Sequence, residues 1–514
     1  MAAPSRGQIN TTYILSHYKV ELYNLSNTWV EIASAHVVAL SGNIDSTANV
    51  NNGIAFGSPA TTSADVDVEE YLVDGTYYIS DPVWMNRNIR ISFAYDDSDY
   101  VQLFFGPITR INKSNNTVKL SMAGVEQHLS DLKIHTPIYY RRLVATKTTS
   151  SSEENPANSG YTAGLLNYAF WQAGGRPWEQ NGIFFSEAST GFKFWYSCDF
   201  SILAPEYSWF SGDNTLDEVY ALVRAAGGQI YQDSLGVLRY TQPMSFGDTT
   251  DYGGTYYTID DSMFVDFSHN VTHVEKVETL KLTYTPRVIA PEQEVINDAT
   301  KRFFLPSETK VIELSPQQPI WSYVGIISGD NTTATNTMHA FLLNNQIVTP
   351  TIGTITTNAA SISITVTNPS STVPMILYNI TIKGRPLVAK DELNLSYGSG
   401  SVERILENNV YIQSEAHALR YLQMIYDFYV QNKPIITLNG MIFDVDRTVG
   451  ELVKVDSNYN NNDPGTLYRI IKIGHNIGTS MDVDLVNITT IYNRTDIFIV
   501  GTSYSDGDVK RLGY

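Results

Sequence analysis

The stretch that decides the fold is WFSGDNTLDEVYALVRAAGGQIYQDSLGVLRY, residues 209–240. Thr215 and Glu218 have the spacing of a capping box, in which two side chains satisfy orphan amides, so a helix is predicted to begin there. One apolar stripe follows, formed by Leu216, Val219, Tyr220, Val223 and Ala226. Gly227 and Gly228 provide a left-handed helix end. The remaining residues predict a strand, a turn and a second strand.

Two more helices are predicted on either side of this stretch. Residues 165–173 place apolar side chains at helical spacing and stop at Gly174-Gly175. Residues 414–430 predict a third helix with Ser414 as its N-cap and one apolar face, made of Ala418, Leu422, Ile425 and Tyr429. Lys433-Pro434 ends this helix because proline cannot continue one.

Most of the remaining chain has the alternation of β-strands. Residues 88–94, NIRISFA, place every second side chain on one apolar face. Gly106-Pro107 is expected to interrupt the strands that follow, and the next strand pair meets at the Asn115-Asn116 turn. Residues 41–64 form a long polar insert between the early strands. A loop of that length is usually functional or ordered by a partner.

The order of these elements predicts a mainly β protein in which two β domains alternate with two α+β domains. The expected divisions are a β domain over 1–145, a linker over 146–160, an α+β domain over 161–264, a second β domain with an inserted loop or hairpin over 265–390, a C-terminal α+β domain over 391–495 and a tail over 496–514. The length of 514 residues agrees with about three to four domains.

Composition excludes several classes of protein. The formal net charge is −19, which does not suit a protein that grips nucleic-acid phosphates. One cysteine, Cys198, cannot build a disulfide scaffold. The first residues lack the apolar core of a signal peptide, and no stretch approaches the roughly 18 apolar residues of a membrane span. Only 17% of residues are charged and 12% are aromatic, so neutral polar and aromatic groups dominate.

No set of residues predicts catalysis, a metal or a cofactor. His269 and His273 are four residues apart but lack further ligands. Asp456-Ser-Asn458 imitates the start of a calcium loop and lacks its glycine and final glutamate. The acidic run with Asp67 and Glu69 is interpreted as a solvated strand face. A sugar-stacking platform is weaker than core packing as an interpretation of Trp171, Trp178, Trp195, Tyr196 and Trp209.

Three stretches resemble one family in their order and spacing. Residues 209–240 resemble the core of bacteriophage baseplate hub proteins, also called tail hub or tail-associated proteins. Residues 104–134 are similar to the closing hairpin of the first hub barrel. Residues 412–456 are similar to the late helix that leads into the final hub strands. The residues that carry the motif in this chain are Trp209, Leu216, Gly227, Gly228, Asp233 and Gly236.

The resemblance implies a structural role in the virion tail tip. Hub proteins of this family are homotrimers, and each chain carries two tail-tube-like β-barrels, so that three chains match a six-fold tube to a three-fold tip. The implied partners are a distal tail or tube protein above and spike or fibre proteins below. DNA would pass without specific binding, because an acidic lumen repels phosphates. The insert at 41–64 would become ordered against a neighbouring barrel.

Two other functions stay open from the sequence. One is a tail-tip glycosidase or peptidoglycan hydrolase that uses acids such as Asp67 and Glu69. The other is a carbohydrate-binding protein for receptor recognition that uses exposed tyrosine and tryptophan side chains. The hub interpretation predicts neither activity, and it implies no catalytic residue, cofactor or metal.

Overall fold

Eighteen parts of the chain are described by the computed structural model. They are residues 16–40, 44–47, 61–73, 75–95, 100–130, 132–145, 164–177, 192–196, 203–233, 235–241, 256–270, 277–327, 338–430, 435–442, 444, 447–457, 467–476 and 480–487. The described chain is mainly β with a few helices, which confirms the predicted class. Among these residues, no helix is long and apolar enough to cross a bilayer.

The N-terminal part folds into one curled antiparallel sheet. Its strands are β1 (Ser16–Tyr23), β2 (Trp29–Ile32), β3 (Val37–Ala39), β5 (Thr61–Glu69), β8 (Asn88–Tyr95), β9 (Val101–Ser114) and β10 (Thr117–Ala123), beside the small pair β6 (Leu72–Val73) and β7 (Tyr77–Tyr78). We call it the first half-barrel. Its concave side holds a core that includes Leu22, Val66, Trp84, Ile91 and Phe104. Strands β5 and β10 alternate buried apolar residues with more exposed polar ones, which leaves their other face polar.

Strand β9 runs straight through Gly106-Pro107, where a break was expected. Pro107 is paired with Asn88 and Gly106 with Ile89, so the register continues across the dipeptide. A Cβ on Gly106 would collide with the backbone of Ala123 on β10. The glycine is there because the strands approach closely, and its presence does not end the strand.

A second curled sheet, the second half-barrel, joins residues far apart in the sequence. Its strands are β17 (Tyr257–Asp260), β18 (Asp266–Asn270), β33 (Ile435–Ile442), β34 (Leu452–Asp456), β35 (Leu467–Asn476) and β36 (Ser480–Asn487). Ile259, Leu438, Val453, Ile470 and Val483 belong to its core. The expected domain limits stay a prediction, but the strands pair across them: β18 lies beside β33 rather than beside the strands of 279–389.

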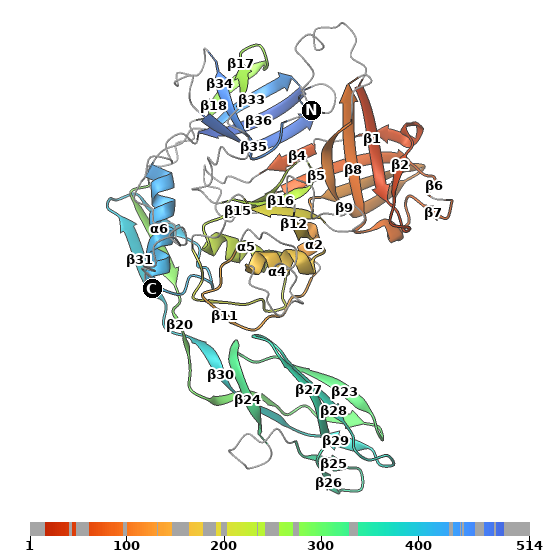
Figure 1. Ribbon diagram of the computed structural model, residues 1–514, viewed down its shortest axis with the longest axis vertical. Helices are drawn as coiled ribbons and strands as arrows, with labels where there is room; N and C mark the ends of the chain where they lie inside the picture. Colours follow the sequence, from red (N-terminus) through yellow and green to blue (C-terminus); the bar gives the residue numbers. More distant parts are fainter. Residues whose placement is uncertain are drawn as a thin grey trace, which may run out of the picture.

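Strand β4 (Ile44–Thr47), which lies inside the polar insert, connects the two half-barrels. It pairs with β5 of the first half-barrel and with β35 of the second. The result is a single 14-stranded sheet with the path β18-β33-β36-β35-β4-β5-β10-β9-β8-β1-β2. Figure 1 shows β4 and β5 between the blue and orange sheets. The insert is thus partly a strand, because the open edges of both sheets provide backbone partners for it.

An α+β module lies below this sheet (Figure 1). It contains α2 (Gln127–Ser130), α4 (Leu165–Gln172), α5 (Thr215–Ala225), β11 (Tyr139–Tyr140), β12 (Arg176–Pro177), β13 (Lys193–Tyr196), β14 (Tyr207–Ser208), β15 (Gln229–Gln232) and β16 (Val237–Thr241). Helix α6 (Glu415–Val430) packs on β19 (Thr279–Tyr284) and β31 (Leu393–Gly398), beside β32 (Glu403–Leu406). Ring contact between Tyr397 and Tyr426, with centroids 5.2 Å apart, fixes that packing. The predicted linker over 146–160 and tail over 496–514 lie outside the described residues.

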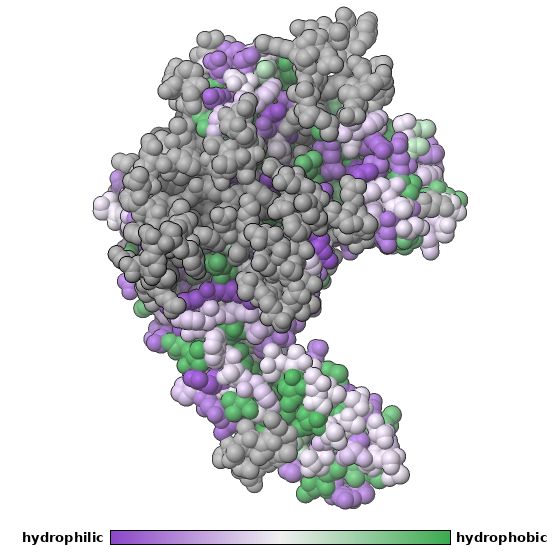
Figure 2. Space-filling model, viewed as in Figure 1, coloured by the Kyte–Doolittle hydropathy of each residue, from purple (hydrophilic) through white to green (hydrophobic). Residues whose placement is uncertain are grey.

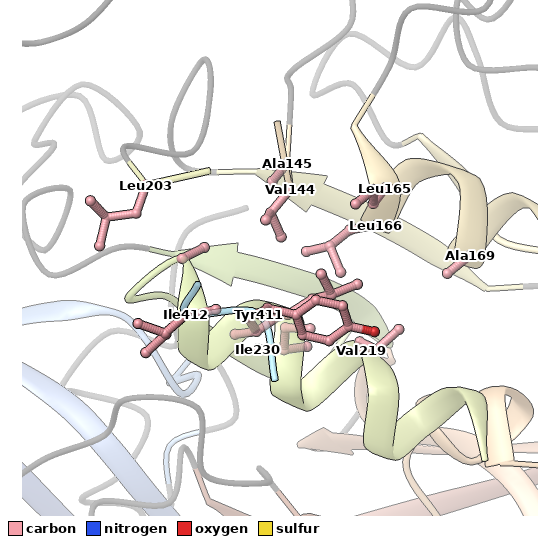
Figure 3. Close-up of a cluster of buried hydrophobic side chains, with 14 of the residues drawn as sticks. Val144, Ala145, Leu165, Leu166, Ala169, Leu203, Val219, Ile230, Tyr411 and Ile412 are labelled. Carbon is pink, nitrogen blue, oxygen red and sulfur yellow. The ribbon is translucent and has the colours of Figure 1, made fainter. Parts of the chain in front are cut away.

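One core unites this module with α6. Its residues come from segments as distant as Val144, Leu166, Ile230 and Leu422. Figure 3 shows Tyr411 and Ile412, which precede α6, packed against Val219 of α5 and Ile230 of β15. The module is therefore the packing centre to which both half-barrels attach.

A β extension projects from the lower end of the molecule (Figure 1). Its strands are β20 (Arg287–Ile289), β21 (Gln293–Asp298), β22 (Arg302–Phe304), β23 (Thr309–Leu314), β24 (Ile320–Ile327), β25 (Ala340–Leu342), β26 (Ile347–Val348), β27 (Thr351–Thr357), β28 (Ile362–Thr367), β29 (Met375–Leu377) and β30 (Ile380–Ala389). They form small sheets around a core of their own, which includes Phe304, Ile364 and Ile382. The Ala359 amide donates to the Thr136 carbonyl at 2.7 Å and links extension and module.

Candidate functional site

Helix α5 and the hairpin after it form as the sequence predicted, with one correction at the helix start. The N-cap is Asn214, whose Oδ1 accepts from the amides of Leu216 (3.0 Å) and Asp217 (3.4 Å). Thr215 is instead buried, and its Oγ1 donates to the Leu132 carbonyl at 2.7 Å. Glu218 accepts from the amide of Ser211 at 2.7 Å. The predicted pair lies one residue too late because a threonine that bonds a distant carbonyl is no longer available as a cap.

Gly227 and Gly228 end α5 where they were predicted to. Gly227 has a φ of +66°, the left-handed conformation that favours glycine. A Cβ on Gly227 would meet the end of the Met424 side chain on α6. A Cβ on Gly228 would collide with the ring of Tyr240 on β16. The glycine pair therefore lets both α6 and the hairpin approach the helix end.

The first side chain that connects the module to a half-barrel is Tyr231, on β15. Its hydroxyl accepts from Nη2 of Arg469, on β35, at 2.8 Å, and the guanidinium lies 5.4 Å from the ring centre. A Cβ on Gly450, whose φ is +89°, would collide with the same ring. Both Tyr231 and Arg469 are buried. Tyr231 is therefore part of the second half-barrel's core although it lies on a strand of the module.

The next residue, Gln232, connects the module to the first half-barrel. Its Nε2 donates to the Phe105 carbonyl at 2.7 Å, and its Oε1 accepts from the Val125 amide at 2.6 Å. Gln232 is 2% exposed, so both bonds are shielded from water. A Cβ on Gly236, in the turn of the hairpin, would meet the side chain of Phe105. Successive side chains of a strand point to opposite faces, which is why neighbours in sequence reach different half-barrels.

Asp233 holds the turn between β15 and β16. Its Oδ1 accepts from the Val237 amide at 2.9 Å, and its Oδ2 pairs with Nε of Arg239 at 2.6 Å. Asp233 is 2% exposed, and Gly236 has a φ of +74°. The buried carboxylate keeps its charge partner and its backbone donor, so the turn keeps one geometry. The motif residues Asp233 and Gly236 thus shape the hairpin that carries Gln232.

Trp209 lies in the core and connects the module to the segment before α6. Tyr411 donates its hydroxyl proton to the Trp209 carbonyl at 2.8 Å, and the two rings meet edge to face, 5.7 Å apart. The Arg287 guanidinium lies 5.2 Å from the Trp209 ring centre. Leu216 packs at the border of the same core. Since Trp209 is 6% exposed, it provides packing rather than a sugar-binding surface.

No protein-family model matches this chain, and no curated protein sequence matches it either. Solved structures do match. The 43 kDa tail protein of prophage MuSo2 from Shewanella oneidensis is 9% identical, with a TM-score of 0.41 over 92% of this chain and 98% of that one. The tail protein from Neisseria meningitidis MC58 is 11% identical, with a TM-score of 0.40 over 91% and 96%.

A third match comes from a secretion system. The E. coli c3393 protein is 8% identical, with a TM-score of 0.30 over 95% of this chain and 76% of that one. It is described as a component of the type VI secretion system with structural similarity to the T4 bacteriophage tail proteins gp27 and gp5. Two of these matching structures are tail proteins, and the third is a secretion-system component that is itself described as similar to tail proteins.

The joined sheet carries acidic side chains on its polar face in both half-barrels. On β5, Asp65, Asp67 and Glu69 alternate with buried Ala64, Val66 and Val68. On β36, Asp482 and Asp484 alternate with buried Met481, Val483 and Leu485. Some acids have partners: Lys119 pairs with Asp65 at 2.9 Å, and Thr437 donates to Asp484 at 2.6 Å.

These acids lie on the same side of the joined sheet. Asp482 is paired with Gly474 on β35, and Gly474 is paired with Asp45 on β4. Asp45 is in turn paired with Ser63, which shares a face with Asp65. Paired residues of antiparallel strands lie on the same face, so the pairings of β36 with β35, of β35 with β4 and of β4 with β5 place these residues on one face of the joined sheet. The two half-barrels therefore present a single acid-rich surface, on which Lys119 lies opposite Asp67 and Lys472 lies opposite Asp484.

Glu126 lies where the first half-barrel meets the module. The residue as a whole is only partly exposed, and its carboxylate folds back against Gly124. Burial raises the pKa of Glu126 to about 7, although hydrogen bonds from the backbone of Glu126 and Thr62 oppose the shift. The junction thus contains a carboxyl group that titrates near neutral pH.

The other residues singled out from the sequence do not come together as a site in so far as they lie in the described parts of the chain. In the described parts of the chain, no three His, Cys, Asp or Glu side chains lie close enough to hold a metal ion. His269 is on β18 and Asp456 ends β34, whereas His273 and Asn458 lie outside the described residues, as does Trp178. Trp171 is partly buried against the Arg176 guanidinium, 4.0 Å from its ring centre.

Sequence reasoning missed Tyr231, Gln232, Arg469 and Gly450 as connecting residues. Gln232 offered one signal: a glutamine inside a strand that directly follows a buried helix end needs hydrogen-bond partners. Nothing in the local pattern named those partners, because Phe105 and Val125 lie more than a hundred residues away in sequence.

Proposed function

We propose that this protein is the structural hub of a phage tail tip or baseplate. The observation that carries the proposal is that β4 joins two curled half-barrel sheets into one sheet with a shared acid-rich face. A chain that only needed two separate β domains would not need a strand hydrogen-bonded to both. Such a strand fixes the spacing and tilt of two similar units, which is the requirement for a subunit of a ring.

In this proposal, the assembled hub is a homotrimer. Three chains with two half-barrels each provide six units, which match a six-fold tail tube above and a three-fold tip below. Each pair of units would act as one rigid body, because β15 binds both half-barrels through Tyr231 and Gln232. The expected partners are a distal tail or tube protein on one side and spike or fibre proteins on the other.

The acid-rich face suits the wall of a DNA conduit. Asp65, Asp67, Glu69, Asp482 and Asp484 lie on one side of the joined sheet. A lumen with excess carboxylates repels the phosphates of passing DNA, so DNA leaves the tail without sticking. The chain as a whole carries a net charge of −19, in keeping with this role. The role is structural, and its place is the virion tail tip, assembled in the cytoplasm of the host.

The test has two parts. Sedimentation of the purified chain measures its mass, and the proposal expects a trimer. If assembled particles that carry a tag on this chain are imaged, the proposal predicts three-fold density at the tail tip. A chain that stays monomeric and never enters tails would overturn the proposal.

A separate assay tests the enzymatic alternative. The structural role predicts that activity staining against peptidoglycan shows no band from this chain. A clear band that disappears when Asp67 and Glu69 are both changed to alanine would replace the structural role with a hydrolytic one.

A further inference from the structure

The far end of the β extension contains a four-stranded sheet that is apolar on both faces. The strand order is β22-β29-β25-β26. Its inner face belongs to the extension's core and holds Phe304, Ala340, Met375 and Leu377, each with 0% of its surface exposed. An antiparallel sheet with one solvated face normally shows polar side chains there. This sheet does not.

The outer face carries a row of apolar side chains that crosses all four strands. Phe303 on β22 is paired with Ile376 on β29, and Ile376 is paired with Phe341 on β25. Phe341 is in turn paired with Ile347 on β26. Paired residues lie on the same face, so these four side chains form one band. We call this band, with Tyr378 beside it, the tip face.

The tip face is exposed in the folded chain. Phe303 is 46% exposed, Phe341 40% and Ile347 63%. The Tyr378 ring meets the Phe341 ring edge to face at 5.4 Å, which extends the face beyond β29. Figure 2 shows hydrophobic residues on the extension, including its lower end, where Figure 1 places β25 and β26. Contiguous exposed apolar surface of this kind marks an interaction site.

Apart from β22, the sequence that forms the tip face is free of Asp, Glu, Lys and Arg. No Asp, Glu, Lys or Arg occurs between Asp330 and Lys383, and the segment supplies β25, β26 and β29. The rest of the chain is strongly acidic, so two copies repel each other wherever their acidic surfaces meet. Contact through an uncharged apolar face avoids that repulsion and buries surface that is depleted in charge, as interface cores are. Lys301, whose Nζ lies 5.2 Å from the Tyr378 ring centre, adds a cation at the border.

We infer that the tip face binds a second copy of this chain. The inference rests on the proposed homotrimer and adds the surface through which the extensions of neighbouring copies meet. A carbohydrate is a poorer fit, because Phe303, Phe341 and Tyr378 are interleaved with aliphatic Ile347 and Ile376, which offer a sugar ring no flat π-face. A partner protein with its own basic surface would be drawn to the acidic sheet rather than to this face.

The test compares two matched substitutions in the full-length chain. Ile347→Glu places a carboxylate on the tip face. Val311→Glu places one on β23, which lies in another sheet of the same extension, and Val311 has the same 63% exposure. Both variants change the net charge by the same amount, so any difference between them reflects the position. Sedimentation equilibrium over a range of concentrations gives the dissociation constant, and thermal unfolding verifies the fold.

The expected result is that Ile347→Glu raises the dissociation constant by about tenfold or more, as loss of a central apolar contact does. Val311→Glu should leave the constant unchanged. Higher salt should tighten association of the unaltered chain, because it screens repulsion between acidic copies.

Three outcomes would overturn the inference. If the unaltered chain forms trimers and Ile347→Glu forms them equally well, the tip face is not the contact, while the proposed hub role stands. If Ile347→Glu keeps the trimer but no longer enters tails, the face binds a different tail protein. If the unaltered chain is monomeric at every concentration, the self-contact is excluded, and imaging of tails then decides the hub role separately.

Discussion

Tyr231 and Gln232 are consecutive residues of β15 whose side chains bind different half-barrels. The Tyr231 hydroxyl accepts a hydrogen bond from Arg469 in the second half-barrel. The Gln232 side-chain amide donates to the Phe105 carbonyl of the first half-barrel and accepts from the backbone amide of Val125, which follows its last strand. The two-residue period of a strand produces this division. One short strand after α5 therefore sets how the two curled sheets sit relative to each other, in addition to β4.

Replacing Gln232 by leucine should destabilise the protein by about 1–3 kcal/mol. Leucine has a similar size but takes away the acceptor of the buried Val125 amide and the donor to the Phe105 carbonyl. Urea denaturation measures the change in the free energy of unfolding. The matched control is Gln293→Leu on the exposed surface of β21, which should change it by less than about 0.5 kcal/mol. Equal effects of both substitutions would contradict the bridging role.

Replacing Gly228 by alanine should lower the thermal stability clearly. The new methyl group would collide with the Tyr240 ring, which is 0% exposed and packed in the core, so it has little room to move. Overpacking of this kind costs about 1–3 kcal/mol. Calorimetry of the purified variant gives the shift in the melting temperature. Gly353→Ala is the control, since its methyl group would lie 3.3 Å from the Thr365 side chain on the edge of the extension; a similar loss there would contradict a special role for Gly228.

A proline in β4 should separate the two half-barrels locally. Ser46 is paired with Ile473 on one side and with Thr62 on the other, so Ser46→Pro removes a backbone donor from the middle of the joined sheet. Hydrogen exchange followed by mass spectrometry should show faster exchange in β5 and β35 than in the unaltered protein. Ser46→Ala keeps the backbone amide and should leave exchange in both strands unchanged. Unchanged protection in the proline variant would mean that β4 does not hold the sheets together.

The stability of the protein should fall as the pH rises because of Glu126. Its pKa is about 7 in the folded state and near 4.5 in the unfolded chain. Between these values the folded state binds more protons than the unfolded state, so the free energy of unfolding decreases with rising pH across this window. The Glu126→Gln variant stays neutral at this position. Relative to it, the free energy of unfolding of the unaltered chain should fall by about 2–3 kcal/mol between pH 4.5 and 8. Parallel pH profiles of the two proteins would show that burial of this carboxyl group has no such effect.

Local elements were predictable because their signals lie within a few residues. The stripe in α5, the glycine pair after it and the N-cap Ser414 of α6 each depend on neighbours one or two turns away. The cap of α5 was placed one residue late, at Thr215 instead of Asn214, because Thr215 bonds a carbonyl 83 residues distant, which no local pattern reveals. The role of Gly106 is equally absent from the local pattern, since it depends on the approach of Ala123 from the neighbouring strand.

The partners of the strands were beyond local reasoning. Residues 257–270 pair with strands of 435–487, although the extension and a helix lie between them in sequence. The alternation of a strand shows which side chains share a face but says nothing of which edge the strand will join. Strand β4 shows this most clearly: in the sequence it is part of a polar insert, and only the open edges of two sheets make it a strand.

The sequence by itself determined the mainly β class, the positions of α4, α5 and α6 and the turns of the stretch from Trp209 to Gly236, because periodicity, caps and turn residues act over short distances. It did not reveal the short helix α2. Only the tertiary structure decided that Tyr231 and Gln232 bind different half-barrels, that the acids of β5 and β36 share one surface, and that the tip face is apolar outside as well as inside. Those features depend on which distant segments meet. Which segments meet depends on the packing of the whole chain, because each strand alone has little preference for a partner and many strands become buried cooperatively.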